Sequence, residues 1–302
     1  MSGLIDVLWG AVSLGLLWAV MTIGVYITYR ILDIADLTVE GSIATGAAVA
    51  AQCIVSGVSP VLATLLATIA GMLAGLITGL LHTKLKIPAL LAGILTMIGL
   101  FSINLHIMGD KANVSLLRMQ SIYTAFQNMG LDTTTAIALV GLLFVAGVIA
   151  LLYWFFGTEI GCSIRATGNN PNMVRAQGIN TNTMKILGLV ISNGLVALSG
   201  ALIAQNQGFS DVQMGIGSIV IGLASVIIGE VLFSKRNFFT RLLGLVFGSV
   251  TYRIIIAVVL KLGMPANDLK LFTAVTVALA LSLPLIRQGV QSKRRNKQQG
   301  VN

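Results

Sequence analysis

Apolar residues follow one another along most of this chain in long runs, and polar residues gather in short segments between the runs. A helix needs about 20 mainly apolar residues to cross the hydrocarbon core of a membrane. Nine runs approach or reach that length, and they predict an all-α, polytopic bundle of about nine transmembrane helices. The predicted spans are 7–29, 41–55, 61–81, 87–109, 136–156, 186–203, 216–233, 242–262 and 271–286.

The composition agrees with a membrane-embedded chain. Hydrophobic residues make up 56% of the sequence and charged residues only 10%, whereas soluble domains contain about 25% charged residues. A soluble fold needs charge to cover its surface, so most of this surface must face an apolar medium. We therefore expect a single transmembrane domain over residues 1–290 and a basic cytoplasmic tail over 291–302, with no soluble domain that could hold a catalytic core.

The basic residues are distributed unequally between the predicted loops. Alternate loops on one side carry 14 Lys and Arg residues, and the loops on the other side carry four. Because cytoplasmic loops are enriched in basic residues, this pattern places the N-terminus outside and the C-terminus in the cytoplasm. The net charge of +9 then reflects orientation and contact with membrane lipid, and it does not indicate nucleic-acid binding. The first apolar run is too long for a signal peptide, so we expect it to be retained as a span.

Small residues at helical spacing mark two expected packing faces. Gly71, Gly75 and Gly79 recur every four residues in the third predicted span, and Gly244 and Gly248 repeat this spacing in the eighth. Such stripes let neighbouring helices approach closely. Chance is the alternative explanation, because the sequence contains 33 glycines.

The outer loop at 110–132 contains apolar residues at helical spacing, which predict a helix on the outer surface. A lip that touches an external partner is a second role open to it. The residues that carry the spacing are Met119, Ile122, Tyr123, Phe126 and Met129.

The second predicted span is unusually short. Short or interrupted helices often line transport sites, because irregular backbone is tolerated in a membrane only against protein or a cavity. Gly41, Ser42 and Thr45 in this span are therefore candidates for the translocation path. A short helix buried in the bundle explains the same pattern equally well.

Arg253 is an isolated charge inside a predicted span. It lies 11 residues into the eighth apolar run, about 16 Å along a helix. A charge at that depth costs at least ~2.5 kcal/mol, so its side chain must face a cavity, a carboxylate or carbonyl groups. One hypothesis places Arg253 in the translocation path, where it receives an anionic group such as an amino-acid carboxylate. The alternative is a structural ion pair with Glu230 or Glu40.

Helix-boundary residues are concentrated in the longest expected cytoplasmic loop, residues 159–183. Asn170 suits an N-cap, Pro171 suits the first helical position and Gly178 suits the C-terminal stop. These residues predict a short helix over 171–177 along the cytoplasmic face. An ordered element is not needed merely to reverse the chain, so we expect it to serve as a rigid contact for another protein.

The same loop, in the run RATGNNPNMVRAQGIN, resembles the cytoplasmic coupling segment of bacterial ABC importer permeases of the branched-chain amino acid and simple-sugar class. The chain departs from the family pattern at Asn172, Met173 and Val174, where the family usually has an acidic residue and small residues. The resemblance assigns ATPase coupling to this segment. The matching positions are Arg165, Ala166, Gly168, Asn170, Pro171, Ala176, Gly178, Ile179 and Asn180.

A second run, ILDIADLTVEGSIATGAAVAA, is similar to the family segment that follows the first span, which has an Asp-Leu-Ser-Val-Gly-Ser pattern. Glu40 is inserted before the glycine of that pattern. The matching positions are Asp36, Leu37, Thr38, Val39, Gly41 and Ser42.

The resemblance implies a complete transport assembly in a bacterial plasma membrane. Two permease chains form the pore, two ABC ATPase subunits dock on the coupling segments, and an extracytoplasmic solute-binding protein delivers the substrate. A second copy of this chain is the default partner. The sequence lacks a GxxxxGK[ST] phosphate loop, so we expect ATP to be hydrolysed by the partner, with no cofactor or metal in this chain. An aromatic or branched-chain amino acid is the expected solute, and a simple sugar or a nucleoside is the alternative.

Three other functional classes explain the sequence less well. An ion-coupled secondary transporter usually carries acidic residues at the membrane midplane, whereas the carboxylates here lie at span ends or in loops. An intramembrane enzyme needs a nucleophile–base pair or a metal-ligand set, and neither pattern is visible. A structural scaffold would leave the ordered loop at 159–183 unexplained.

Overall fold

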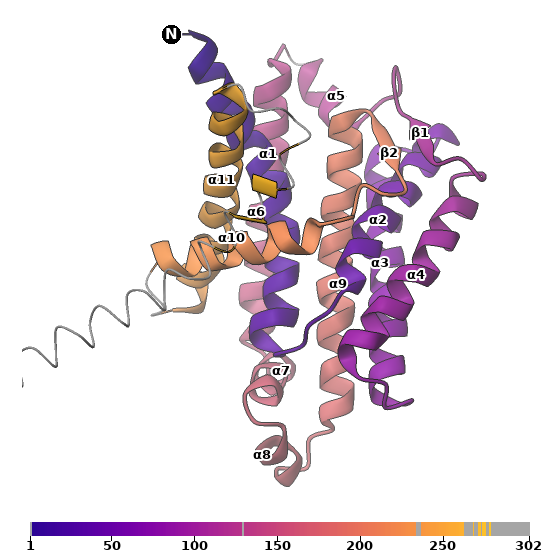
Figure 1. The fold of residues 1–302 in the computed structure, drawn as a ribbon, viewed down its shortest axis with the longest axis vertical. Helices are drawn as coiled ribbons and strands as arrows, with labels where there is room; N and C mark the ends of the chain where they lie inside the picture. Colours follow the sequence, from indigo (N-terminus) through magenta and orange to yellow (C-terminus); the bar gives the residue numbers. More distant parts are fainter. Residues whose placement is uncertain are drawn as a thin grey trace, which may run out of the picture.

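The computed structural model describes residues 2–128, 130–233 and 237–262, together with 268, 271–272, 274–275 and 278. Long helices packed side by side dominate the described part (Figure 1). In chain order the elements are α1 (Ser2–Tyr26), a π-helical segment η1 (Ile27–Ile31), α2 (Thr38–Val55), α3 (Pro60–Thr83), α4 (Ala89–Ile107), β1 (Asn113–Ser115), α5 (Ile122–Gln127), α6 (Thr133–Phe156), α7 (Glu159–Asn169), α8 (Pro171–Ala176), α9 (Thr181–Gln207), β2 (Phe209–Asp211), α10 (Ser218–Leu232) and α11 (Phe238–Lys261).

The described residues contain seven helical segments that are long and apolar enough to cross a membrane. This confirms the predicted helical membrane bundle, but it does not confirm the count of nine spans. The seventh predicted span, 216–233, forms only the 15-residue helix α10, which is shorter than a membrane crossing requires. The ninth predicted span, 271–286, lies largely outside the described residues.

The first two spans are joined through an interrupted segment. η1 ends at Ile31, residues 32–37 are not helical, and α2 begins at Thr38. In Figure 1 this connection rises from the lower end of α1 to the middle of the bundle, where α2 starts. The second span is therefore short because part of its path across the bundle is non-helical chain.

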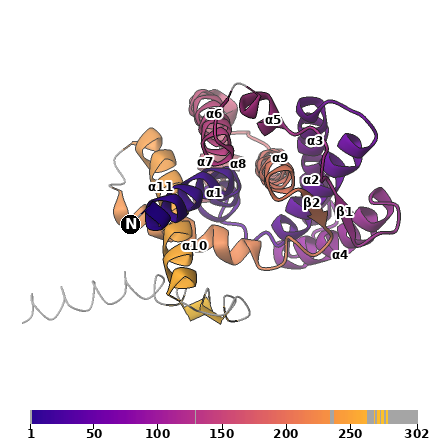
Figure 2. The ribbon, with the colours of Figure 1, turned by 90° about the horizontal axis from the view of Figure 1, so that it is seen from above.

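Helix α9 lies at the centre of the bundle, between α1 and α3 (Figure 2). The glycine stripe of α3 faces it. A Cβ atom at Gly75 would collide with the Leu189 carbonyl group, and one at Gly79 would lie 3.1 Å from Ile186 Cα. The prediction that Gly71, Gly75 and Gly79 form a close packing face is thus confirmed.

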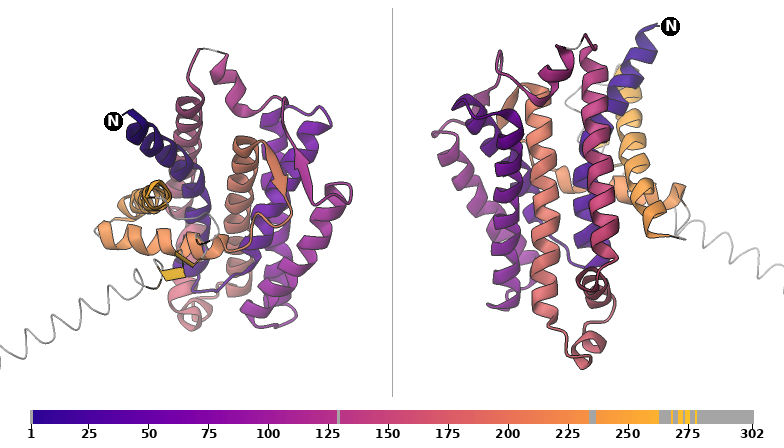
Figure 3. Two further views of the ribbon diagram at one scale, coloured as in Figure 1. Left: turned by 45° about the horizontal axis from the view of Figure 1, so that its top comes forward. Right: turned by 180° about the vertical axis from the view of Figure 1, so that it is seen from behind.

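Helices α10 and α11 form a second closely packed pair beside α1. Gly244 approaches the backbone of Gly229, and Gly248 approaches the Ser225 carbonyl oxygen, which confirms the second predicted glycine face. Figure 3 shows that α10 lies across the direction of the long helices instead of along it.

The end of the bundle that carries α5 also contains a two-stranded antiparallel ribbon, which the sequence did not predict. Strands β1 and β2 have three residues each, too few to show a period-two pattern. Helix α5 is shorter than predicted and partly buried: Gln205 Oε1 accepts a hydrogen bond from the Ile122 amide at 3.0 Å, and Tyr123 Oη donates to the Leu202 carbonyl oxygen at 2.9 Å. The predicted surface helix therefore packs on α9, and Met129 lies outside the described residues.

Candidate translocation path and coupling segment

Two helices form the loop for which a single short helix was predicted. Helix α8 begins at Pro171 as expected, because the Asn170 side chain accepts a hydrogen bond from the Met173 amide at 3.1 Å. Gly178 follows with a φ of +82°, a conformation that favours glycine. Helix α7 precedes α8 and was not predicted; the Thr158 hydroxyl accepts from the Gly161 amide at its start.

The predicted coupling segment contains one fully buried residue on α8 and several exposed residues. Val174 is fully buried and holds α8 in place, whereas Asn170 and Ala176 are exposed and Ala166 and Ile179 are half-buried. The exposed positions leave one side of the segment accessible to a partner.

Gly168 is the point at which α7 touches the interrupted connection between α1 and α2. A Cβ atom at this position would collide with the carbonyl group of Ile31, the last residue of η1, and would lie 2.9 Å from Leu32 Cα. Helix α7 is therefore packed directly against the start of the non-helical stretch 32–37.

The candidate path residues of α2 are buried inside the bundle. Gly41 packs against Leu100 of α4, the Thr45 hydroxyl donates to the Gly41 carbonyl at 2.9 Å, and the Ser42 hydroxyl donates to Asn193 Oδ1 at 2.7 Å. In this conformation they contact neighbouring helices and do not line an open cavity.

A buried polar network surrounds the start of α2. Asp36 accepts hydrogen bonds from the Thr38 amide at 2.9 Å and from Asn193 Nδ2 at 2.8 Å. The Thr38 and Thr78 hydroxyls lie 2.7 Å apart, and Thr78 donates to the Thr96 hydroxyl at 2.9 Å. The network links α2 with α3, α4 and α9.

A second non-helical segment contacts the first turn of α2. Residues 212–217 connect β2 to α10, and Glu40 Oε1 accepts a hydrogen bond from the Gly217 amide at 2.9 Å. Gly215 lies against the Glu40 carbonyl oxygen, and Gly217 has a φ of +81°. The first turn of α2 and the N-terminus of α10 therefore lie together inside the protein.

Arg253 lies elsewhere, on α11. Its guanidinium stacks over the Trp18 ring of α1, with Cζ 4.1 Å from the ring centroid, and its Nε is buried without a hydrogen-bond partner among the described residues. The ion pair suggested as an alternative is not formed in this part of the chain: Glu40 binds the Gly217 amide, and Glu230 pairs with Arg30 at 2.9 Å. α11 packs on α1 and α10, so Arg253 is not brought together with the α2 path residues.

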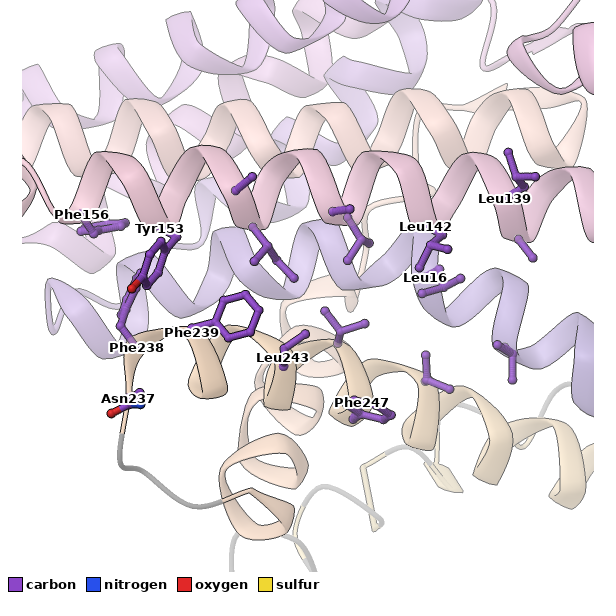
Figure 4. Close-up of a pocket in the computed structure, with 18 of the residues that line it drawn as sticks. Leu16, Leu139, Leu142, Tyr153, Phe156, Asn237, Phe238, Phe239, Leu243 and Phe247 are labelled. Atoms are coloured by element: carbon purple, nitrogen blue, oxygen red, sulfur yellow. The ribbon is translucent and has the colours of Figure 1, made fainter.

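A long apolar groove of about 1700 Å³ runs between α1, α6 and α11 (Figure 4). Leu16, Leu142 and Phe247 are among the side chains that line it. Asn237 and Phe238 lie at one end in Figure 4, and Arg165 lies beside Phe238. A smaller polar pocket of about 560 Å³ adjoins that end and contains Arg30, Arg165 and Arg241. The described residues contain no group of three or more His, Cys, Asp or Glu side chains arranged to hold a metal ion.

Comparison with known proteins identifies the family of this chain. The sequence model of the family described as "Branched-chain amino acid transport system / permease component" matches residues 8–281. The chain belongs to this family. The protein is a permease subunit of an ABC importer, a multi-pass protein of a bacterial membrane.

Two relatives cover nearly the whole permease. It is 43% identical over 282 residues to the tyrosine transport system permease protein of Clostridioides difficile (strain R20291), covering 93% of this chain and 91% of the relative. It is 33% identical to the uncharacterized protein RP368 of Rickettsia prowazekii (strain Madrid E), covering 92% and 97%. The solved structure of PsaBC from Streptococcus pneumoniae in complex with Fab matches with a TM-score of 0.50, 16% identity and 94% coverage of both chains, which is a likeness of fold.

The sequence did not single out several residues that organise the interior of the permease. Thr78 and Thr96 join the Asp36 network through Thr38, and Asn193 joins it from α9 through hydrogen bonds with Ser42 and Asp36. Threonines at 78 and 96 in otherwise apolar spans were the available signal. That signal is weak, because a threonine in a membrane helix usually bonds to its own backbone, as Thr83 does here.

Proposed function

We propose that this permease carries an amino acid into the cell, and that an aromatic amino acid is the first candidate. The observation that carries the proposal is the 43% identity, over 93% of the chain, to a protein named for tyrosine transport. A simple sugar or a nucleoside is not favoured, because the matching family description also names amino-acid transport. An ion-coupled mechanism is not favoured either, because the family is that of ABC permeases.

The energy for transport would come from separate ATPase subunits that dock on α7 and α8. The exposed face of the segment and its buried Val174 anchor suit a rigid docking element. In this proposal, closure of the ATPases moves α7, and the contact of Gly168 with Ile31 passes that movement to the non-helical stretch 32–37. Asp36 at the end of this stretch then shifts with its partners on α3, α4 and α9.

The translocation path would open where α2 and α10 meet. Both helices begin inside the protein after non-helical segments, as in transporters whose interrupted helices surround a substrate site. Gly41, Ser42 and Thr45 are buried in the present conformation and would become accessible when α2 moves relative to α9. This is an alternating-access mechanism, with the described conformation closed around α2.

The proposed orientation places α7 and α8 in the cytoplasm. The opposite end, with α5 and the β1–β2 ribbon, would receive the extracytoplasmic solute-binding protein. A second copy of this chain would complete the pore.

Reconstitution tests the proposal directly. The permease, its co-purified ATPase and its solute-binding protein are placed in proteoliposomes, and uptake of labelled tyrosine, leucine, ribose and a nucleoside is compared. We expect ATP-dependent uptake of tyrosine that an uncoupler does not reduce. Uptake driven by a proton gradient and indifferent to ATP would refute the ABC mechanism, and uptake of ribose alone would refute the substrate.

A further inference from the structure

The apolar groove and the polar pocket adjoin each other and share two lining residues. The groove runs between α1, α6 and α11, and the pocket lies where η1 and the start of α11 meet α7. Arg165 and Phe238 line both. The Arg165 guanidinium lies 5.6 Å from the Phe238 ring centroid, so a cation and an aromatic ring mark the junction.

We propose that this site binds one anionic phospholipid from the leaflet on the α7–α8 side of the membrane. Its phosphate group lies in the pocket among the arginines, and one acyl chain lies along the groove. The leaflet is the cytoplasmic one if the orientation given under Proposed function holds. Binding itself does not depend on that orientation or on the transported solute.

The charge of the pocket fits an anionic headgroup. Among the described residues, three arginines line it, Arg30, Arg165 and Arg241, together with one carboxylate, that of Asp33. The Arg30 guanidinium is partly neutralised by Glu230, but its side chain is 47% exposed and can still contact a ligand. Guanidinium groups donate paired hydrogen bonds that match phosphate oxygens, which makes arginine well suited to this headgroup.

The groove fits an acyl chain better than it fits a polar solute. Its lining is almost entirely aliphatic and aromatic from Leu16 and Leu142 to Phe247, and polar or charged groups lie mainly at the Arg165 end. Leu142 and Phe247 are 58% and 51% exposed, so the described residues leave much apolar surface open. A polar head next to a long apolar channel is the chemistry of a phospholipid, with the phosphate at the membrane boundary.

The position of the site gives such a lipid a role in coupling. Arg165 lies on α7, one turn before Gly168, which touches Ile31. Phe238 begins α11 and packs on Phe156 at the end of α6, with ring centroids 5.2 Å apart. A bound lipid would therefore brace α7 against α6 and α11, and its loss would loosen the contact that moves with the ATPases.

Native mass spectrometry of the purified permease tests the headgroup. The protein is exchanged into mixed vesicles of phosphatidylglycerol and phosphatidylethanolamine, then released in mild detergent. We expect one retained phosphatidylglycerol, with retention falling roughly five-fold for each of Arg165→Gln and Arg241→Gln. Lys84→Gln removes a basic charge on the α3–α4 loop outside the site and should change nothing. Equal retention by the arginine variants and the control would overturn the proposal, as would equal retention of the two lipids.

A photo-crosslinking experiment tests the groove without altering the arginines. A benzoylphenylalanine replaces Leu142 in native membranes, and the products are resolved by intact mass. A mass increase of one phospholipid supports the proposal. A covalent dimer would show that a second copy occupies the groove, and an internal crosslink to residues 263–302 would show that the chain itself does; either product without a lipid adduct overturns the proposal. Inorganic phosphate added during mass spectrometry should not displace the lipid, because phosphate alone lacks the acyl chain.

Discussion

Asn193 shows how one side chain can join three parts of a membrane bundle. It donates to Asp36 Oδ2 at 2.8 Å and to the Leu189 carbonyl at 3.0 Å, and it accepts from Ser42 at 2.7 Å. Asn193→Leu keeps the side chain at a similar size, but it removes the acceptor of the buried Ser42 hydroxyl and one of the two hydrogen bonds that Asp36 accepts from Asn193 and Thr38. We expect a loss of roughly 1–3 kcal/mol in the free energy of unfolding, measured as a lower melting temperature in detergent.

The matched control for Asn193 is Asn182→Leu, at an exposed position near the start of the same helix. Only the backbone amide of Asn182 takes part in the Asn180 cap, so replacing its exposed side chain should leave the melting temperature nearly unchanged. Equal melting temperatures for the two variants would contradict a structural role for the Asp36 network.

Replacing Arg253 distinguishes a stabilising role of this residue from a substrate-binding role. Its stacking on Trp18 should be worth about 2 kcal/mol in a desolvated site. Because α11 does not pack on α2, we expect Arg253→Gln to lower thermal stability while the KM for the solute stays unchanged. Trp18→Leu should have the same effect through the other partner. A large rise in KM in the Arg253 variant alone would instead place Arg253 in the translocation path.

At the scale of elements, close packing of α3 on α9 depends on the absence of side chains. A Cβ atom at Gly75 would strike the backbone of Leu189, which cannot move aside without displacing α9. Gly75→Ala should therefore destabilise the permease by roughly 1–3 kcal/mol, seen as a lower melting temperature and lower yield. Gly99→Ala on α4 is the control, because a Cβ atom at that position would meet nothing within 4 Å. If both variants melt together, the close contact is not a source of stability.

The α7–α8 segment allows the coupling proposal to be tested through a helix cap. Asn170→Ala removes the acceptor for the Met173 amide and should destabilise the start of α8 by about 1 kcal/mol. We expect weaker recovery of the ATPase in a pull-down of the tagged permease, with the melting temperature of the bundle little changed. Asn170→Asp retains the acceptor and should restore ATPase recovery. Full recovery with the alanine variant would argue that the cap is not needed for docking.

At the scale of the whole molecule, the two ends of the bundle can be assigned to the two sides of the membrane. Cys162 on α7 is exposed and free, and Leu117 next to β1, at the opposite end, is 77% exposed. In a Cys53→Ala background, a membrane-impermeant maleimide should label Cys162 only in inside-out vesicles. In a chain without either native cysteine, Leu117→Cys should be labelled only from the outside. Reversed labelling of both would invert the proposed orientation.

Local chemistry was enough to predict much of the helical framework. Long apolar runs predicted where most membrane helices lie, because a chain in lipid must satisfy its backbone hydrogen bonds within each helix. Asn170, Pro171 and Gly178 predicted the ends of α8 to within one residue, because capping acts between neighbouring residues. The glycine stripes predicted two packing faces, because residues four apart in the sequence lie on the same face of a helix. Composition and the loop motif together predicted the family.

Tertiary structure alone decided which distant polar groups meet. Asp36 and Asn193 are 157 residues apart, and no local pattern relates them. The apolar run at 216–233 did not reveal that α10 has only 15 residues and lies across the long helices, because a short helix packed on α1 and α11 is as apolar as one that crosses the membrane. The buried charge of Arg253 needed a stabilising partner, but only the packing of α11 on α1 determined that this partner is the Trp18 ring and not a carboxylate. Sequence determined the helices and their faces through short-range physics, whereas their partners depended on how the whole bundle packs.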